Sequence, residues 1–281
     1  MTATTVPARR RVSAFARRAW IQQGTTAVWL AALVGGALGV LVFLGSGGVN
    51  TLANMPDLIP SDPDGLVAVR DTAGEFLPMT SYLLTMTPAI LGMLVAIVAT
   101  LTLPGVVADD ITGGGIEALL AGPIPRRHLF SAYLGAALVL TAVAWIVAML
   151  AFVLTSVVTS LVIGASVSLS PTYGVALVVV PLSMGVWSAT ATLFGALLYP
   201  SSLDTKAGLN GGPIRLVAML PALIAVPSVL LLPEWVLPAL ALVLAVTLLA
   251  SLILIQLTAR GFRSTRVLGG LSKEKCVRMP P

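Results

Sequence analysis

Charged residues, cysteine and histidine are all scarce in this sequence. Charged side chains make up 10% of its 281 residues and hydrophobic side chains make up 57%, whereas about 25% of the residues of a soluble domain are charged. A chain with so few charges cannot cover its own surface with polar groups, so lipid must cover it. The composition therefore predicts an all-α, multi-pass integral membrane protein of the cell membrane.

The single cysteine, Cys276, and the single histidine, His128, limit the chemistry of the chain. One cysteine cannot form an intramolecular disulfide, and these two residues cannot supply the three or four ligands of a typical metal site. Asp57, Asp62 and Asp64 in the first long loop lack the spacing of an EF-hand, which favours a solvated acidic loop over a calcium site. We therefore expect no metal site.

Catalytic and nucleotide-binding motifs are missing as well. Neither a Gly-x-x-x-x-Gly-Lys-Ser/Thr phosphate loop nor a His-Glu-x-x-His motif occurs in the sequence. The glycines at 113–115 lack the lysine and the preceding strand of a phosphate loop, so we interpret them as a helix stop or hinge. Asp109 and Asp110 are more typical of a solvated helix end than of a metal pair. We expect no catalytic residue, no enzymatic activity and no cofactor bound by this chain.

Long apolar runs predict six transmembrane helices, because one span needs about 20 apolar residues. The expected spans are 26–44, 82–103, 129–164, 172–198, 214–232 and 236–258. They form a transmembrane domain over 26–258, between an N-terminal segment, 1–25, and a basic tail, 259–281. The third run is far longer than one span needs. Its middle contains no glycine, proline or asparagine, which favours one long helix over two short ones.

The positive charges are distributed unevenly around these spans. With six spans and a cytosolic N-terminus, fifteen of the 16 lysines and arginines lie on the cytosolic side and only Arg70 lies outside. Cytosolic loops of membrane proteins carry such an excess of positive charge. We therefore expect both termini in the cytosol and an acidic outer loop over 45–81. The net charge of +5 is then a topology signal and a contact with anionic lipids, rather than a nucleic-acid surface.

The N-terminal segment combines arginines with apolar residues at helical spacing. We expect an amphipathic helix that lies in the cytosolic interface of the membrane, anchored by Arg17, Arg18 and Trp20. The alternative is a disordered basic tail before the first span.

A polar segment, 105–128, separates the second and third spans and has more structure than a simple turn. Ile116, Leu119 and Leu120 are spaced i, i+3 and i+4, which predicts one apolar face of a short helix. Two prolines and two arginines follow, which end that helix and mark the cytosolic entry of the third span. The short helix either lies on the membrane surface or docks onto a partner.

This segment resembles the corresponding part of the ABC-2 type permeases, the membrane subunits of ABC exporters. Those proteins carry an acidic helix end, a glycine, a Leu-Glu-x-Leu-Leu-like turn and a Pro-small-x-Arg-like exit before their third span. The matching residues here are Asp109, Asp110, Gly115, 116–120, 123–126 and Leu129 onward. Six expected spans and a basic N-terminus extend the resemblance over nearly the whole chain. The departures are Pro125, where the family usually has a small polar residue, and the lack of an obvious re-entrant helix between spans five and six.

The resemblance implies a permease subunit that works with other chains. It implies a cytosolic coupling helix that docks into a groove on a separate ABC ATPase subunit, formed by Ile116, Glu117, Ala118, Leu119 and Leu120. It also implies a second permease half, identical or different, and ATP and magnesium bound on the ATPase subunit. The alternatives are a secondary carrier and a non-transporting membrane partner protein. The absence of ionisable residues inside the spans disfavours an ion-coupled carrier.

Uncharged side chains of the second and fifth spans are candidates for the lining of an export route, since the resemblance implies that these two spans bound it. The candidates are Thr85, Thr87, Thr100, Thr102, Met219 and Ser228. An uncharged lining suits a hydrophobic or amphipathic substrate that is drug-like, lipid-like or peptide-like, because desolvating an ion without a partner is costly. The alternative is that the hydroxyls bond carbonyls of their own helix.

Overall fold

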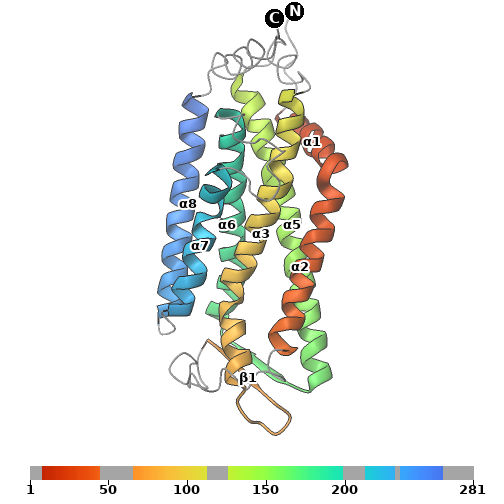
Figure 1. Ribbon diagram of the computed structural model, residues 1–281, viewed down its shortest axis with the longest axis vertical. Coiled ribbons are helices and arrows are strands. Elements are labelled where there is room, and N and C mark those ends of the chain that lie inside the picture. The colour runs from red at the N-terminus through yellow and green to blue at the C-terminus, as the bar shows by residue number, and fades with distance from the viewer. Residues whose placement is uncertain (1–7, 45–65, 113–125, 199–212, 232–234, 262–281) are drawn as a thin grey trace, which may run out of the picture.

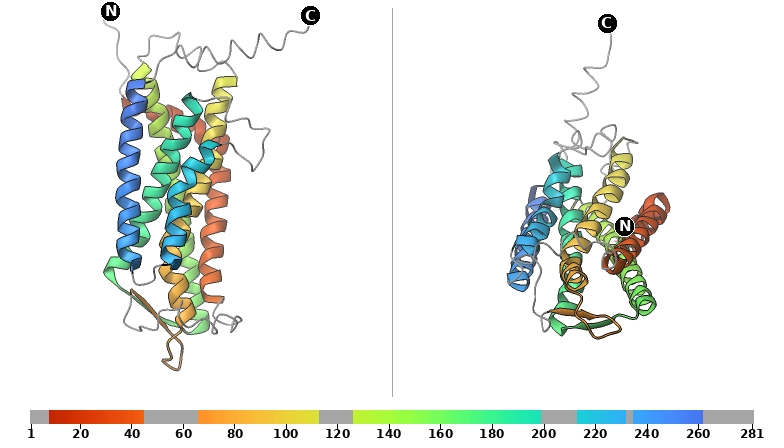
Figure 2. Two further views of the ribbon diagram at one scale, coloured as in Figure 1. Left: turned by 60° about the vertical axis from the view of Figure 1, so that its left-hand side comes forward. Right: turned by 60° about the horizontal axis from the view of Figure 1, so that its bottom comes forward.

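The helices of the chain lie side by side in one elongated bundle (Figure 1). The computed structural model describes residues 8–44, 66–112, 126–198, 213–231 and 235–261. Most of these residues are helical, and the long helices run along the bundle axis in every view (Figure 2).

The helices are α1 (Ala8–Ala19), a π-helical turn η1 (Trp20–Gly24), α2 (Thr25–Leu44), α3 (Pro78–Thr112), α5 (Arg126–Ile163), α6 (Pro171–Leu198), α7 (Pro213–Leu231) and α8 (Val236–Gly261). Two short strands, β1 (Val67–Arg70) and β2 (Ser166–Leu169), complete the described structure. The β1 end and α1 lie at opposite ends of the bundle (Figure 1).

Five helices are long and apolar enough to cross a membrane, judged by length and composition within the described residues. Their apolar stretches are Val12–Leu44, Pro78–Leu101, Ser131–Ile163, Pro171–Gly195 and Val236–Leu257. They correspond to five of the six expected spans. The other expected span corresponds to α7, whose described apolar part, Ile214–Val229, is shorter. The chain therefore has the build of a membrane-embedded protein.

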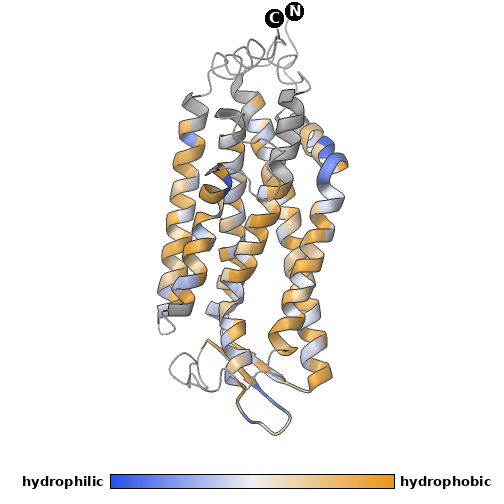
Figure 3. Ribbon diagram, in the orientation of Figure 1, coloured by the Kyte–Doolittle hydropathy of each residue, from blue (hydrophilic) through white to orange (hydrophobic). Residues whose placement is uncertain are grey.

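Large apolar side chains cover the outside of the bundle. Trp29 and Leu161 are each 75% exposed, and Leu249 on α8 is 61% exposed. The long helices are largely hydrophobic along their length, whereas hydrophilic residues are prominent in α1 and in the loop after β1 (Figure 3). Apolar surface on this scale is what lipid contact requires.

Two expectations about the spans have definite outcomes. The expectation of one long helix over the third run is confirmed, because α5 is a single helix of 38 residues. The second span was expected at about 82–103, and the structure places its apolar helical stretch at Pro78–Leu101, within a helix that begins at Pro78. Proline has no amide hydrogen to donate and its backbone angle suits the first position of a helix, which explains the earlier start.

The two strands correct the expectation of an entirely helical chain. β1 and β2 form a two-stranded antiparallel sheet in which Val67 pairs with Leu169 and Arg70 pairs with Ser166. The first three residues of β1 are buried, whereas β2 is exposed throughout. The sheet therefore joins the loop before α3 to the loop between α5 and α6 and covers that end of the core.

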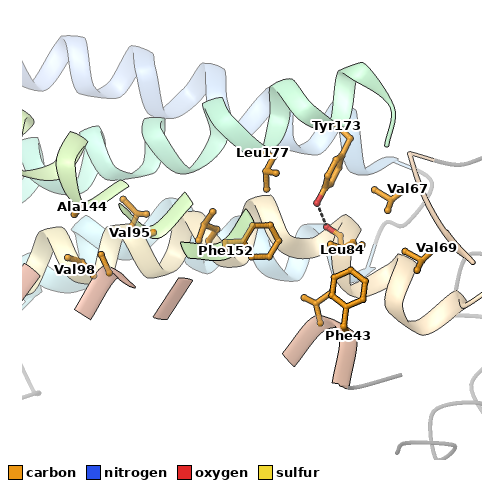
Figure 4. Packing of buried hydrophobic residues seen from close by; sticks show 14 of the residues in the cluster. Phe43, Val67, Val69, Leu84, Val95, Val98, Ala144, Phe152, Tyr173 and Leu177 are labelled. Carbon is orange, nitrogen blue, oxygen red and sulfur yellow. Dashed lines mark hydrogen bonds between the residues drawn. The ribbon is translucent and has the colours of Figure 1, made fainter. Parts of the chain in front are cut away.

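One hydrophobic core cluster joins α2, α3, α5, α6 and β1 (Figure 4). Its large buried members include Phe43, Val69, Leu84, Phe152 and Leu177. A second cluster joins α3, α6, α7 and α8. Its members include Met86, Ala89, Val180, Met184, Ala222, Ala225, Val229 and Leu240. α3 and α6 contribute to both clusters, so they form the centre of the bundle.

α2 contacts α5 through a stripe of small buried residues spaced four apart. The stripe consists of Ala27, Ala31, Gly35 and Gly39. A Cβ atom on Gly35 would lie 2.9 Å from the carbonyl carbon of Ala148, and one on Gly39 would lie 2.7 Å from the carbonyl oxygen of Phe152. These distances leave no room for a side chain, so the backbones of α2 and α5 approach each other directly.

Candidate functional site

The expected interfacial anchor lies at the junction of α1 and α2. Arg17 and Arg18 occupy the last turn of α1 and are exposed, and Trp20 begins the π-helical turn and is 41% exposed. A Cβ atom on Gly24 would lie 2.6 Å from Cδ2 of Trp20. The indole ring therefore rests against the backbone at Gly24, one π-helical turn further along. The exposed ring of Trp20 thus follows two exposed arginines in the chain, and the interfacial role expected for these three residues stays a prediction.

The apolar face of α1 packs on α5. A Cβ atom on Gly135 would lie 2.8 Å from Cγ1 of Val12, and the ring centroids of Phe15 and Tyr133 are 4.8 Å apart. Ala19 is buried in a small cluster with residues of α3, α5 and α6. The expected helix over this segment is therefore present, and its apolar residues contact the bundle, which the sequence did not predict.

The expected coupling residues, Ile116, Glu117, Ala118, Leu119 and Leu120, lie outside the described residues. The two helices that border them are described: α3 runs to Thr112 and α5 begins at Arg126. Both of these ends lie at the end of the bundle that carries α1 (Figure 1).

The expected route residues on α3 satisfy their hydroxyls within their own helix. Thr85 donates to the carbonyl of Ser81 at 2.9 Å and Thr87 donates to that of Leu83 at 3.0 Å. Thr100 donates to the carbonyl of Ile97 at 2.8 Å. The side chain of Thr102 lies outside the described residues. These local bonds match the alternative interpretation of the threonines as groups that satisfy themselves.

The two expected route residues on α7 are half-buried. Ser228 donates to the carbonyl of Ile224 at 2.7 Å, and Met219 lies nine residues earlier on the same helix. α7 packs against α3 in the second core cluster, where Met86 and Ala89 of α3 meet Ala222 and other residues of α7. The two helices expected to bound a route therefore contact each other within one chain.

Polar side chains of α6 reach across to α3 and α7. The hydroxyl of Tyr173 donates to the carbonyl of Leu84 at 2.7 Å (Figure 4). Nε1 of Trp187 donates to the carbonyl of Val217 at 3.0 Å. These contacts between helices were not predicted from the sequence. The prolines in α3 and α7 each indicate a carbonyl without an intrahelical donor, but the sequence does not show which helix supplies the replacement donor.

The two-stranded sheet is fixed to α3 and α6 by hydrogen bonds. The amide of Val69 donates to Oγ of Ser81 at 3.0 Å, and that hydroxyl donates to the carbonyl of Leu77 at 2.9 Å. The amide of Ser170 donates to the carbonyl of Leu66 at 3.0 Å. Oγ of Ser170 accepts from the amide of Tyr173 at 3.2 Å and so caps α6.

A few polar groups on α5 are buried without a partner. Among the described residues, Oγ1 of Thr141 and Nε1 of Trp145, one turn apart on α5, have no hydrogen-bond partner. Thr141 is 2% exposed, and its Cγ2 atom would lie 2.8 Å from a Cβ atom on Gly185 of α6. The contact of α5 with α6 therefore contains a buried hydroxyl, that of Thr141, which lowers the stability of the bundle.

Groups of three or more histidine, cysteine, aspartate or glutamate side chains that are placed to hold a metal ion do not occur in the part of the chain that the structure describes. Asp57, Asp62 and Asp64, the residues weighed as a calcium site, lie outside that part. No protein-family model matches the chain, and neither the curated proteins nor the solved structures include a match.

Proposed function

We propose that this chain is the membrane-spanning permease subunit of an ATP-driven exporter of the ABC-2 type. It crosses the cell membrane six times with both termini in the cytosol, and it pairs with a second permease half. A separate ABC ATPase subunit binds ATP and magnesium, and its closure moves the spans through the coupling helix. The exported substrate is hydrophobic or amphipathic.

The observation that carries the proposal is the polar segment between α3 and α5. It combines the acidic helix end, the glycines, the apolar pair Leu119 and Leu120, and the Pro-x-Pro-Arg exit. The helices that border it are 35 and 38 residues long, which is about 52 and 57 Å at 1.5 Å per residue. Both exceed the hydrocarbon thickness of about 30 Å. Such helices are long enough to carry the segment out of the membrane toward a cytosolic subunit.

Two observations support six spans rather than five. α7 has 19 residues, which is about 28 Å of helix and close to the hydrocarbon thickness. α1 and the C-terminal end of α8 lie at the same end of the bundle (Figure 1), as an even number of passes requires. An even number also keeps the basic tail on the same side as the basic N-terminal segment.

The chemistry of the coupling residues suits a protein groove. The apolar side chains of Leu119 and Leu120 can fill such a groove, and the carboxylate of Glu117 can pair with a basic group at its rim. An acidic substitution of Leu120 places an unpaired carboxylate in that apolar contact, which costs several kcal/mol.

The substitution Leu120→Asp tests the proposal. We expect the variant to insert at the normal level and to lose the ATPase subunit on purification in mild detergent, together with the ATP hydrolysis that depends on the complex. Ala121→Asp is the matched control, because it adds the same charge one position away, off the apolar face. Normal assembly and normal hydrolysis with Leu120→Asp contradict the proposed coupling helix.

A further inference from the structure

Two helices that face α6 contain internal prolines. Pro88 and Pro104 lie in α3, and Pro221 and Pro227 lie in α7. Proline has no amide hydrogen, so the carbonyl four residues before it loses its intrahelical donor. The carbonyls that Pro88 and Pro221 affect are those of Leu84 and Val217, respectively. In apolar surroundings an unpaired carbonyl is costly, so a folded membrane helix needs another donor at that position.

α6 supplies the missing donor in both cases. The hydroxyl of Tyr173 donates to the carbonyl of Leu84 at 2.7 Å. Nε1 of Trp187 donates to the carbonyl of Val217 at 3.0 Å. The hydroxyl of Ser188, the residue next to Trp187, donates to the carbonyl next to Val217 at 2.8 Å. α6 therefore contacts the same kind of backbone defect in two different helices.

Several of the residues that form these hydrogen bonds are buried. Tyr173 is 2% exposed and Leu84 is 4% exposed, and both Ser188 and Ala218 are fully buried. Water cannot replace the donor at the carbonyls of Leu84 and Ala218 while the helices stay in contact, whereas Val217 is 49% exposed and its bond from Trp187 lies at the surface of the bundle. Other hydroxyls, such as that of Thr247 in α8, bond a carbonyl of their own helix instead. The bonds from α6 are thus connections between helices rather than local side-chain contacts.

We propose that α6 stabilises α3 and α7 at Pro88 and Pro221 through Tyr173, Trp187 and Ser188. The prolines weaken the two helices at these positions, and the side chains of α6 supply donors there. Separation of α6 from α3 or α7 leaves the carbonyl of Leu84 or of Val217 without this donor, so the three helices are held together at these two positions. This proposal concerns the helices themselves and does not depend on transport.

Double-mutant cycles on the purified full-length protein test the proposal. Y173F removes the hydroxyl and keeps the ring. We expect it to raise the unfolding equilibrium constant, measured by titration of mild-detergent micelles with SDS, by about threefold to twentyfold, the range that corresponds to hydrogen bonds between membrane helices. P88A restores an amide donor for the carbonyl of Leu84. In the P88A background we expect the effect of Y173F to fall below about twofold.

A second double-mutant cycle tests the contact of α6 with α7, and a tyrosine variant of α3 serves as the control. W187F removes the Nε1 donor and is expected to raise the same constant in the native background and to have a smaller effect in the P221A background, because alanine restores an amide donor for the carbonyl of Val217. Y82F removes a tyrosine hydroxyl from half-buried Tyr82 of α3 and is expected to change the constant less than Y173F does. Equal effects of Y173F with and without Pro88, and of W187F with and without Pro221, overturn the proposal, because the two donors then act independently of the prolines.

Discussion

The direct contact of α2 with α5 predicts opposite effects for alanine at two neighbouring glycines. A Cβ atom on Gly35 would lie 2.9 Å from the carbonyl carbon of Ala148, which is backbone and cannot move aside as a side chain does. On Gly36 a Cβ atom would meet only Cγ2 of Thr155, at the ordinary contact distance of 3.6 Å. Gly35→Ala therefore forces the two helices apart, whereas Gly36→Ala does not.

The magnitudes follow from two terms. Replacement of glycine by alanine inside a helix gains up to about 1 kcal/mol, and this gain is common to both variants. Overpacking of a tight contact costs about 1–3 kcal/mol. Because the common gain cancels, Gly35→Ala is expected to be less stable than Gly36→Ala by about 1–3 kcal/mol. Gly36→Ala is expected to equal or exceed the native protein in stability.

Reversible unfolding in mixed micelles, followed by the loss of helical circular dichroism, measures this difference. Both variants keep the charge and polarity of the native chain, so insertion into the membrane is the same for the two. Equal free energies of unfolding for the two variants refute direct backbone contact between α2 and α5 at Gly35.

Two further predictions concern a buried hydroxyl and the outer loop. Thr141→Val removes a hydroxyl that has no partner among the described residues, so the free energy of unfolding is expected to stay equal or rise. Thr247→Val, which breaks a 2.8 Å bond to the carbonyl of Val243, is expected to lower it by about 0.5–1.5 kcal/mol, and a loss of that size in Thr141→Val contradicts the first expectation. Ala73 is exposed in the loop between β1 and α3, so a cysteine introduced there in a Cys276→Ser background is expected to react with an impermeant thiol reagent added to intact cells. Native Cys276 is expected not to react, and its labelling from outside indicates an odd number of spans.

The long helices of the bundle were predictable from the sequence because their signal is local. Runs of about 20 apolar residues report membrane helices without knowledge of their neighbours. The uninterrupted apolar middle of 129–164 correctly indicated one helix, α5. The same local argument placed a helix over the arginine-rich N-terminal segment, where α1 is found.

The contacts between these elements were not predictable, because they depend on residues far apart in the chain. β1 pairs with β2 across about a hundred residues, and each strand has only four residues and no strong alternating pattern of its own. Pro88 marks the carbonyl of Leu84 as unpaired, but nothing in the sequence names Tyr173 as its donor. Likewise, the apolar residues of α1 are equally suited to lipid and to a helix, and their contact with α5 follows only from the fold.

Whether this chain purifies with an ABC ATPase subunit tests the proposed permease most directly. The measurement is native mass spectrometry of the chain purified from its own cells in mild detergent, with magnesium and a non-hydrolysable ATP analogue present. We expect a complex of two permease halves and two ATPase subunits. The loss of both ATPase subunits from the Leu120→Asp variant is expected to leave the permease halves inserted and folded. Purification of the native chain alone, or with partners that have no ATPase subunit among them, contradicts the proposed function.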